Sequence, residues 1–477
     1  MNIENLFALK PSAPDRMISA ALVGAGEFGA SFIGQARRAP HIEPRVVCDL
    51  DIGRARKAAL AGGLTEGEII ACHSAAEAKA ALERGLVALI GDAAHLEGLA
   101  VDVVVEATGD PEGAAMTALA AIEAGRHLVM VTKEAECIIG PILAHRARQN
   151  GVVHTPVDGD QPSLLIGLIG WARVLGLPIV AAGKSSESDF VWDSEAGTVT
   201  AWEKAVPAAD FAGAFGKLGS DPLALLDARA RLPFPRATVP DLCEMGIVAN
   251  HTGLMPDVAA MHAPIARTTE LPSLFRPAAE GGLLSGTGRV DMFNCLRRPD
   301  ELSFAGGVFV IAETPDIATG KLFAGKGIPC SPDGRYVLLH NPVHLLGAEA
   351  PMSALSAALL GQSTGGAEVL PRVDLTARAS RDLEPGETLI MGYRHVIEGL
   401  EPQLTPARPL GPSEPVPYYL TSGRPMVRKV ARGAVVTCAD IALDESTTLV
   451  RLRREQDALF NPGALLTSLQ HSVCSIQ

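Results

Sequence analysis

Residues 18–29 read ISAALVGAGEFG, and they are the strongest indication of the fold of the first part of the chain. A β-branched apolar run is followed by three glycines in the spacing G-x-G-x-x-G, and a helix-like segment comes next. The first two glycines let the backbone approach a pyrophosphate, the third allows close helix–sheet packing, and the helix N-terminus attracts the anion. The stretch therefore predicts a strand, a tight turn and a helix that bind a dinucleotide. The residues expected at that cofactor are Gly24, Gly26, Glu27, Phe28 and Gly29.

A second apolar strand, PRVVCDL, places Asp49 near its end, 25 residues after Gly24. A carboxylate at this point accepts hydrogen bonds from the ribose hydroxyls of NAD. Arg54 and Arg56 follow closely, however, and either could pair with the 2′-phosphate of NADP. The sequence therefore leaves NAD and NADP open as the cofactor. Asp51 is predicted to be a helix N-cap.

Two further apolar strands, in VDVVVEATG (101–109) and HLVMVTKEAE (127–136), have the continuous hydrophobic character of buried parallel strands. The first ends in Thr108 and Gly109, small residues against which the nicotinamide half of a cofactor could lie. Lys133 follows the second strand, on the side where open α/β sheets bind ligands. The alternative for Lys133 is a solvated lysine at the start of a helix.

The segment DGDQP (158–162) precedes an apolar run that is typical of a helix. Asp160 or Gln161 could cap this helix, with Pro162 in its first turn. A cap needs only one acid, so the second carboxylate, Asp158, leaves room for a role in binding or catalysis. After the helix, a strand in PIVAAGKSSES (178–188) carries Lys184, which we expect to act as an electrophile or proton donor. The alternative is an exposed turn lysine.

A helix is predicted over about 241–250, where Glu244 would face either substrate hydroxyls or solvent. His251 is interpreted as a packing or surface residue rather than a catalytic base. Strands are expected in 306–313 and 336–346, and a helix in 349–361 that returns to the first domain.

The predicted fold is α/β and has three domains: an N-terminal Rossmann domain, an α+β substrate domain and a small β-rich C-terminal domain. The C-terminal part contains two strand–turn–strand patterns, at 377–392 and 427–449, separated by a proline-rich stretch without regular structure. The boundaries are placed at 1–155 for the Rossmann domain, 156–340 for the substrate domain, 341–371 for the returning helix and 372–477 for the β domain.

Composition and net charge indicate which kinds of molecule the protein binds. The chain has 477 residues and a net charge of −13, which argues against a broad nucleic-acid surface. Its eight cysteines form no C-x-x-C pair or zinc spacing, and no segment is typical of an export signal or a membrane span. We therefore expect a cytoplasmic protein with reduced thiols, a small-molecule substrate and no nucleic-acid or membrane partner. We also expect a homo-oligomer.

Six motifs together resemble homoserine-dehydrogenase-like NAD(P) oxidoreductases that carry a C-terminal SAF domain. The best characterised branch of that family is the 1-deoxy-D-xylulose 5-phosphate reductoisomerase-like enzymes, which make 2-C-methyl-D-erythritol 4-phosphate with NADPH. The resemblance covers nearly the whole chain. The motifs are VGAGEFG (23–29), VTKE (131–134), DGDQP (158–162), AGK (182–184), ANHTGLMPD (249–257) and, for the SAF part, RDLEPGETL (381–389).

The resemblance implies roles for individual residues. Lys133 matches the lysine after the strand at the cofactor site, and 158–162 falls where the family has a turn facing the nicotinamide. Homoserine dehydrogenases, however, pair an Asp with a Lys four residues later, whereas Glu244 is followed four residues later by Val248. Their N-G-T signature is also not evident after Lys184. These departures argue against homoserine dehydrogenase activity itself.

Three functions follow as hypotheses. The first is reduction, with skeletal rearrangement, of a small polyhydroxylated carbonyl compound, in which the lysines polarise a carbonyl or hold a phosphate. Asp160 and Glu244 would then move protons, and a divalent metal could bind Asp158 and Asp160, together with Glu244. The second is a simple NAD(P)-dependent dehydrogenase, homoserine dehydrogenase included. The third is a non-catalytic NAD(P) sensor. The residues expected to carry catalysis are Lys184, Asp160, Lys133 and Glu244.

Overall fold

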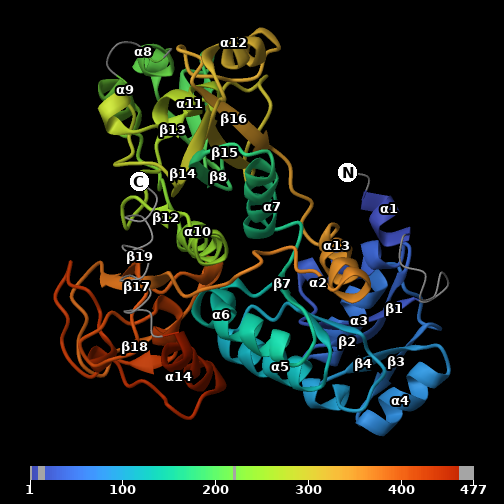
Figure 1. The fold of residues 1–477 in the computed structure, drawn as a ribbon. Helices are drawn as coiled ribbons and strands as arrows, with labels where there is room; N and C mark the ends of the chain where they lie inside the picture. The colour runs from blue at the N-terminus through green and yellow to red at the C-terminus, as the bar shows by residue number, and fades with distance from the viewer. Residues whose placement is uncertain (1–2, 9–16, 217, 219–221, 461–477) are drawn as a thin grey trace.

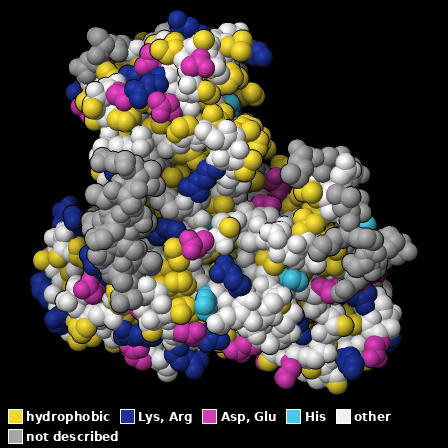
Figure 2. Space-filling view, viewed as in Figure 1, with side chains coloured by type: hydrophobic (Ala, Val, Ile, Leu, Met, Phe, Trp, Pro, Cys, Tyr) yellow, Lys and Arg dark blue, Asp and Glu magenta, His cyan; other side chains and the backbone are white. Residues whose placement is uncertain are grey.

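A computed structural model describes residues 3–8, 17–216, 218 and 222–460. Figure 1 shows three parts: the first sheet with its helices, a second sheet that stands above it, and a C-terminal part beside the first sheet. On the face drawn in Figure 2, the surface is hollowed between the part that contains α12 (Ile317–Gly325) and the part that contains α13 (Ala350–Leu355). Among the described helices, none combines the length and apolar composition that a membrane crossing requires.

The first sheet has seven parallel strands in the order β3-β4-β2-β1-β5-β6-β7, which confirms the predicted α/β class and the Rossmann-like arrangement. The strand order reverses between β1 and β5, and ligands bind at such a switch point in open parallel sheets. The strands are β1 (Ile18–Val23), β2 (Ile42–Cys48), β3 (Ile69–Cys72), β4 (Val87–Ile90), β5 (Val103–Glu106), β6 (His127–Met130) and β7 (His154–Pro156). The helices are α1 (Ile3–Ala8), α2 (Glu27–Ala36), α3 (Ile52–Ala61), α4 (Ala75–Glu83), α5 (Pro111–Glu123) and α6 (Lys133–Gln149).

Local signals start these helices at the carboxyl edge of the sheet. Asp51 caps α3 as predicted, because its side chain accepts a hydrogen bond from the amide of Gly53 at 2.8 Å. Asp160 is the N-cap of α7 (Gln161–Val174), and Pro162 lies in its first turn, where a missing amide costs least. These caps fix where each helix begins, and therefore which side chains point into the edge of the sheet.

The second sheet is mixed and has the order β11-β10-β9-β14-β8-β15-β16, with β12 and β13 also paired to β14. Helices α7 and α10 (Val239–Thr252) pack on one face, and α11 (Leu271–Leu274) and Phe275 pack on the other. The strands are β8 (Ile179–Ser185), β9 (Phe190–Asp193), β10 (Thr198–Ala201), β11 (Lys204–Pro207), β12 (Met255–Pro256), β13 (Ile265–Ala266), β14 (Arg289–Arg297), β15 (Val308–Glu313) and β16 (Tyr336–Asn341). Two more helices here are α8 (Ala212–Phe215) and α9 (Pro222–Arg229).

The segment after β16 returns to the first sheet. Helix α13 packs against α2 and β6, and its Ala350 and Ala354 are buried in the same apolar cluster as the residues of β1. A single π-helical turn, Ser356–Leu360, extends it before the chain passes into the C-terminal part. The predicted helix over 349–361 is therefore present, with a wider last turn.

Within residues 372–460, the C-terminal part contains two two-stranded sheets and the helix α14 (Thr448–Phe460). Its strands are β17 (Val373–Ala379), β18 (Thr388–Leu389), β19 (Leu400–Pro406) and β20 (Arg424–Pro425). Helix α14, which the sequence interpretation missed, packs on α5 and α6. Its Gln456 donates to the carbonyl of Ile138 and accepts from the amide of Ile142. Pro141 lies inside α6, between Ile138 and Ile142, and has no amide to donate to the helix. Helix α14 therefore supplies hydrogen bonds to backbone groups beside this proline.

Candidate functional site

Four secondary-structure elements bring charged side chains together at the carboxyl edge of the first sheet. Lys133 is the first residue of α6, directly after β6, and Asp160 is the N-cap of α7. Lys184 lies on β8, and Glu244 lies on α10. The four residues predicted to carry catalysis therefore come from different elements and meet at one place.

Glu244 stands between the two lysines. Its Oε1 lies 2.5 Å from the Nζ of Lys133, and its Oε2 pairs with the Nζ of Lys184. The Nζ of Lys133 also lies 3.3 Å from the Oδ2 of Asp160. We call Lys133, Asp160, Lys184, Glu244 and Asp241 the lysine–glutamate cluster.

Asp241 is a member of this cluster that sequence reasoning missed. Its Oδ1 lies 2.9 Å from the Nζ of Lys184, and its Oδ2 accepts hydrogen bonds from the backbone and hydroxyl of Thr238 in a capping box. Residues three apart share a helix face, so the D-x-x-E spacing from Asp241 to Glu244 after a Thr-x-Pro start was a usable signal. Glu187 also reaches Lys184, at 3.3 Å, from the turn after β8.

Burial separates the two lysines. The side chain of Lys184 is 0% exposed, whereas that of Lys133 is 25% exposed. Lys184 is therefore neither an exposed turn lysine nor a group with access to solvent in this structure. Lys133 is therefore the more exposed of the two lysines.

The pKa values of the two carboxylates move in opposite directions. Burial alone would raise the pKa of Glu244, but the ammonium groups of Lys133 and Lys184 outweigh it and lower that pKa. Burial raises the pKa of Asp160, and the charge of Lys133 only partly offsets it. The pKa values of both lysines are raised, because their carboxylate partners outweigh the loss of solvent. The charged form is thus favoured for Glu244, whereas burial favours the protonated form of Asp160 more than in an exposed aspartate.

Asp158 lies apart from this cluster. Its carboxylate accepts a hydrogen bond from the hydroxyl of Ser163, and its amide donates to Ser353 at 2.7 Å. Burial raises the pKa of Asp158 to about 6, with a further contribution from Glu349. No group of three His, Cys, Asp or Glu side chains in the described ranges is placed to hold a metal ion. The expectation that Asp158 and Asp160 share a metal ion is therefore not supported by their geometry.

The glycine turn has the shape that a pyrophosphate requires. Gly24 has a φ of 99°, and a Cβ there would lie 2.3 Å from the carbonyl oxygen of Ala107, so β1 and β5 approach too closely for any side chain. A Cβ on Gly29 would lie 2.8 Å from the oxygen of Gly24, which explains the tight packing of α2. A Cβ on Gly26 would meet no atom within 4 Å, so the space in front of α2 is open to a ligand.

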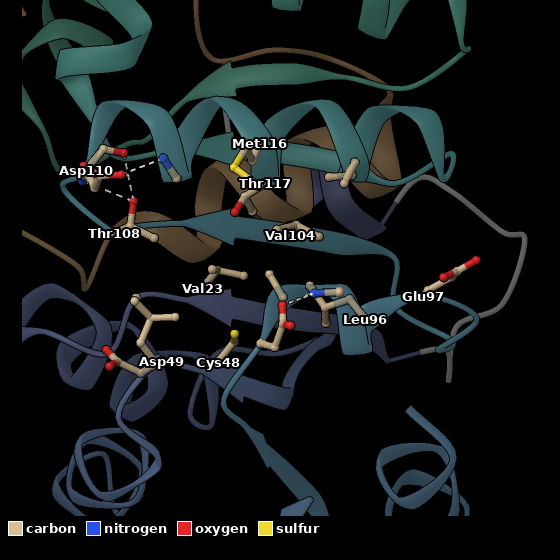
Figure 3. A pocket seen from close by; sticks show the side chains of 18 of the residues that line it. Val23, Cys48, Asp49, Leu96, Glu97, Val104, Thr108, Asp110, Met116 and Thr117 are labelled. Carbon is tan, nitrogen blue, oxygen red and sulfur yellow. Dashed lines mark hydrogen bonds between the residues drawn. The ribbon is translucent and has the colours of Figure 1, made fainter. Parts of the chain in front are cut away.

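A cavity of about 780 Å³ continues from this turn between β2 and α5. Figure 3 shows Asp49 on one side and Thr108 with Asp110 across from it. The carboxylate of Asp49 accepts from the amides of Ala25 and Asp51 and lies 3.5 Å from Arg54. Of the predicted cofactor residues, Gly24, Asp49 and Thr108 line the cavity. Those that do not line it are Gly26, Glu27, Phe28, Gly29, Gly109 and Lys133.

A second buried carboxylate lies one helical turn beyond Lys133 on α6. The Oε2 of Glu136 is 2.8 Å from the Nε2 of His154, and its Oε1 is 3.2 Å from the Nε2 of His251. The backbone amide of Gly366 donates to the Nδ1 of His251, so the Nε2 of a neutral His251 carries the proton. This glutamate–histidine cluster is almost fully buried, which agrees with the interpretation of His251 as a packing residue.

Comparison with known proteins places an oxidoreductase domain in the middle of the chain. Residues 237–350 match the family described as oxidoreductase DRL, catalytic domain. The match begins just before α10 and ends at the start of α13, and it confirms the prediction of an oxidoreductase enzyme. Among curated proteins, no relative matches the chain.

Several solved structures are similar to part of the chain. A dehydrogenase from Chromobacterium violaceum is 16% identical, with a TM-score of 0.27, over 36% of this chain and 46% of its own. The WlbA dehydrogenase from Bordetella pertussis, in complex with NADH and UDP-GlcNAcA, is 19% identical, with a TM-score of 0.24, over 38% and 49%. A DOX-P reductoisomerase in complex with magnesium is 19% identical, with a TM-score of 0.27, over 36% and 46%. This chain thus spans about half the length of these structures, and at such low TM-scores the likeness carries no functional argument.

Proposed function

We propose that the protein is an NAD(P)H-dependent oxidoreductase that reduces a small polyhydroxylated carbonyl compound. In its sharper form, the reaction is the reductoisomerisation of 1-deoxy-D-xylulose 5-phosphate to 2-C-methyl-D-erythritol 4-phosphate. One observation carries the proposal: the lysine–glutamate cluster lies at the carboxyl edge of the Rossmann-like sheet, with Lys133 partly exposed. The family match over 237–350 supports the oxidoreductase class, and the sequence motifs support the sharper form.

The dinucleotide would lie across the glycine turn, with its pyrophosphate at α2 and its adenosine half in the cavity beside Asp49. The amide of Ala25 orients the carboxylate of Asp49, and a carboxylate at this position favours NAD. The nearby Arg54 would bind the 2′-phosphate if the cofactor were NADP. When bound, the reduced nicotinamide supplies the hydride. The remaining chemistry belongs to side chains of this chain.

Lys133 is assigned the role of an electrophile. Its ammonium donates to the carbonyl oxygen of the substrate and stabilises the negative charge that develops there. Because its pKa is raised, Lys133 keeps its proton and acts by charge and hydrogen bonding. Glu244 pairs with both Lys133 and Lys184, and Asp241 pairs with Lys184, so Glu244 holds Lys133 in place. Lys184 is therefore a positioning residue in this scheme.

Asp160 is assigned the proton transfers. In the rearrangement a hydroxyl loses a proton and a carbonyl oxygen gains one, and one carboxyl group can serve both steps. The reduction that follows adds a hydride to carbon and a proton to oxygen. Burial raises the pKa of Asp160 and so favours its protonated form more than in an exposed aspartate, which supports a role in proton transfer.

The test is a coupled assay of NADH and NADPH oxidation with purified protein. The panel contains 1-deoxy-D-xylulose 5-phosphate, aspartate semialdehyde and several unphosphorylated hydroxycarbonyl compounds. Turnover with the first substrate, lost in Asp160→Asn, supports the reductoisomerase. Turnover with aspartate semialdehyde alone would replace it with the simple dehydrogenase. Normal dinucleotide binding without any turnover would favour the sensor.

We further propose that the C-terminal part, 372–477, is an SAF domain that helps to shape the substrate cleft. Contacts of α10 with β17 and β19 support a place for it beside the cluster. Cytoplasmic location and assembly as a homo-oligomer are part of the same proposal. Size-exclusion chromatography with light scattering would test the assembly.

A further inference from the structure

Two hairpin tips with unusual backbone geometry meet near the lysine–glutamate cluster. In the C-terminal part, the turn Tyr393–His395 has a φ of 53° at Arg394 and 59° at His395. Left-handed conformations are uncommon for side chains of this size, and two in succession are costly. The turn is nevertheless well supported, because the amide of Gly392 donates to the carbonyl of Val396 at 2.8 Å.

The second tip connects β10 and β11 in the substrate part. Trp202 and Glu203 also have positive φ values, 51° and 62°, where a two-residue hairpin of this type usually contains Asn or Gly. The guanidinium carbon of Arg394 lies 5.0 Å from the centre of the Trp202 ring. The C-terminal part and the substrate part therefore touch through these two tips.

His395 extends this contact to the first sheet. Its Nδ1 lies 2.8 Å from the Oε1 of Glu134, the residue after Lys133. Its ring lies beside Gly109 at the end of β5, since a Cβ on that glycine would be 3.6 Å from the His395 Cε1. Residues of α10 also contact the same turn. The turn Tyr393–His395 thus lies beside Glu134 and Gly109, next to the proposed position of the nicotinamide.

Charge compensation distinguishes Arg394 from the other cations nearby. Lys133 and Lys184 are each paired with two or more carboxylates, which partly neutralise the positive charge of both lysines. Arg394 is exposed, and within the described part of the chain no carboxylate pairs with it; its flat faces meet only the rings of Trp202 and Tyr393. A guanidinium stacked in this way keeps its N–H edge free for a bidentate contact with an oxyanion.

We propose that Arg394 and His395 form a phosphate subsite, through which the C-terminal part binds the phosphate group of the substrate. This inference rests on the proposed function and deepens it, because it makes a phosphorylated carbonyl compound the substrate class. Arg394 supplies the bidentate contact. His395, oriented by Glu134 through Nδ1, offers Nε2 to the same group.

The test uses the full chain and inorganic phosphate as the probe, measured by calorimetric titration with and without saturating NADPH. Arg394→Gln is compared with Arg432→Gln, an exposed arginine elsewhere in the same part of the chain. We expect Arg394→Gln to weaken phosphate binding by about tenfold or more. His395→Gln should weaken it by a smaller factor, and Arg432→Gln should leave it unchanged. Thermal melting of each variant checks that the fold is retained.

Dinucleotide binding, followed by NADPH fluorescence, separates this inference from the proposed function. Unchanged NADPH affinity in Arg394→Gln, together with weakened phosphate binding, supports the subsite. Equal phosphate binding by wild type and Arg394→Gln overturns it, and so does a loss confined to NADPH binding. Absence of NADPH binding in the wild type would sink the proposed function, while the phosphate titration without cofactor would still decide the subsite.

Discussion

Helices α6 and α10 are joined at two places by a buried glutamate held between two basic side chains. In the lysine–glutamate cluster the acid is Glu244, on α10, and its partners are lysines. In the glutamate–histidine cluster the acid is Glu136, on α6, and its partners are histidines. The first cluster has one partly exposed member, Lys133, and two carboxylates whose pKa values move apart. The second is sealed from solvent.

A reactive buried charge differs from a structural one in its access to solvent and in the protonation of its neighbours. Burial of an ion pair is not by itself a sign of function, because partner charges can compensate it completely. What sets the first cluster apart is the partial exposure of Lys133 and a neighbouring acid, Asp160, whose pKa burial raises. Substitutions in the two clusters should therefore have different effects on activity and stability.

The largest effect is expected for Lys133→Met. Removing an electrophile from the developing negative charge should lower kcat about 10²–10³-fold. The unfolding free energy should change little, because the lysine is partly exposed and Lys184 still pairs with Glu244. Steady-state kinetics and urea denaturation measure the two quantities. An unchanged kcat would show that the first cluster is as structural as the second.

Glu136→Gln should have the opposite profile. It leaves two buried histidines without their charged partner, so we expect the unfolding free energy to fall by about 3–5 kcal/mol. The activity per folded molecule should stay close to that of the wild type. Glu244→Gln is the matched variant and should lower both quantities. A large loss of activity in folded Glu136→Gln would contradict the division between the clusters.

The second cluster should also have a defined acid dependence. Burial alone would raise the pKa of Glu136, but His154 and His251 outweigh it and lower that pKa to about 2. A depressed acid pKa stabilises the folded state above the unfolded value, near 4.5, and this stability is lost as the pH falls towards 2. The loss should reach about 3 kcal/mol. Urea denaturation from pH 6 downwards should therefore be steeper in pH for the wild type than for Glu136→Gln, and parallel curves would refute the assignment.

The smallest effect is expected for Thr238→Ala, which removes the N-cap of α10. It should cost about 1 kcal/mol of stability. Because Asp241 shares its carboxylate between Thr238 and Lys184, the change should disturb the first cluster more than the second. A moderate drop in kcat with an unchanged acid profile is the expected result. Thr252→Ala, at the other end of α10, is the control.

The first sheet could be predicted from the sequence because its signals are local. The glycine spacing, the continuous apolar strands and the caps at Asp51 and Asp160 all act within a few residues of the feature they specify. Lys133 could be proposed as a site residue because ligands gather at the carboxyl ends of parallel strands, and Lys184 because it lies near the end of a predicted strand. Asp160 and Glu244 could be proposed from the local sequence at the start of one helix and on the face of another. The pairing of these residues could not be predicted, since Lys184 and Glu244 are 60 residues apart.

Strand β14 and helix α14, which the sequence did not predict, contain buried polar residues. Strand β14 interrupts its apolar pattern with Asp291 and Asn294, both fully buried. Their partners are distant: Asp291 accepts from the amide of His262, and Asn294 donates to backbone carbonyls outside the strand. Helix α14 similarly buries Arg453 against Asp374 of β17. A hydrophobic pattern cannot reveal such residues, because only the tertiary partner makes their burial tolerable.

Helix α14 packs on α5 and α6, which are synthesised much earlier than α14. The amides of Thr448 and Leu449 donate to the carboxylate of Glu112, more than 300 positions earlier. At roughly ten residues per second, a ribosome needs on the order of half a minute to make the chain between them. During that interval the face of α5 and α6 on which α14 packs, including the turn at Pro141, lacks the helix that covers it. The apolar surface that α14 covers therefore stays exposed to solvent until Thr448–Phe460 has been made.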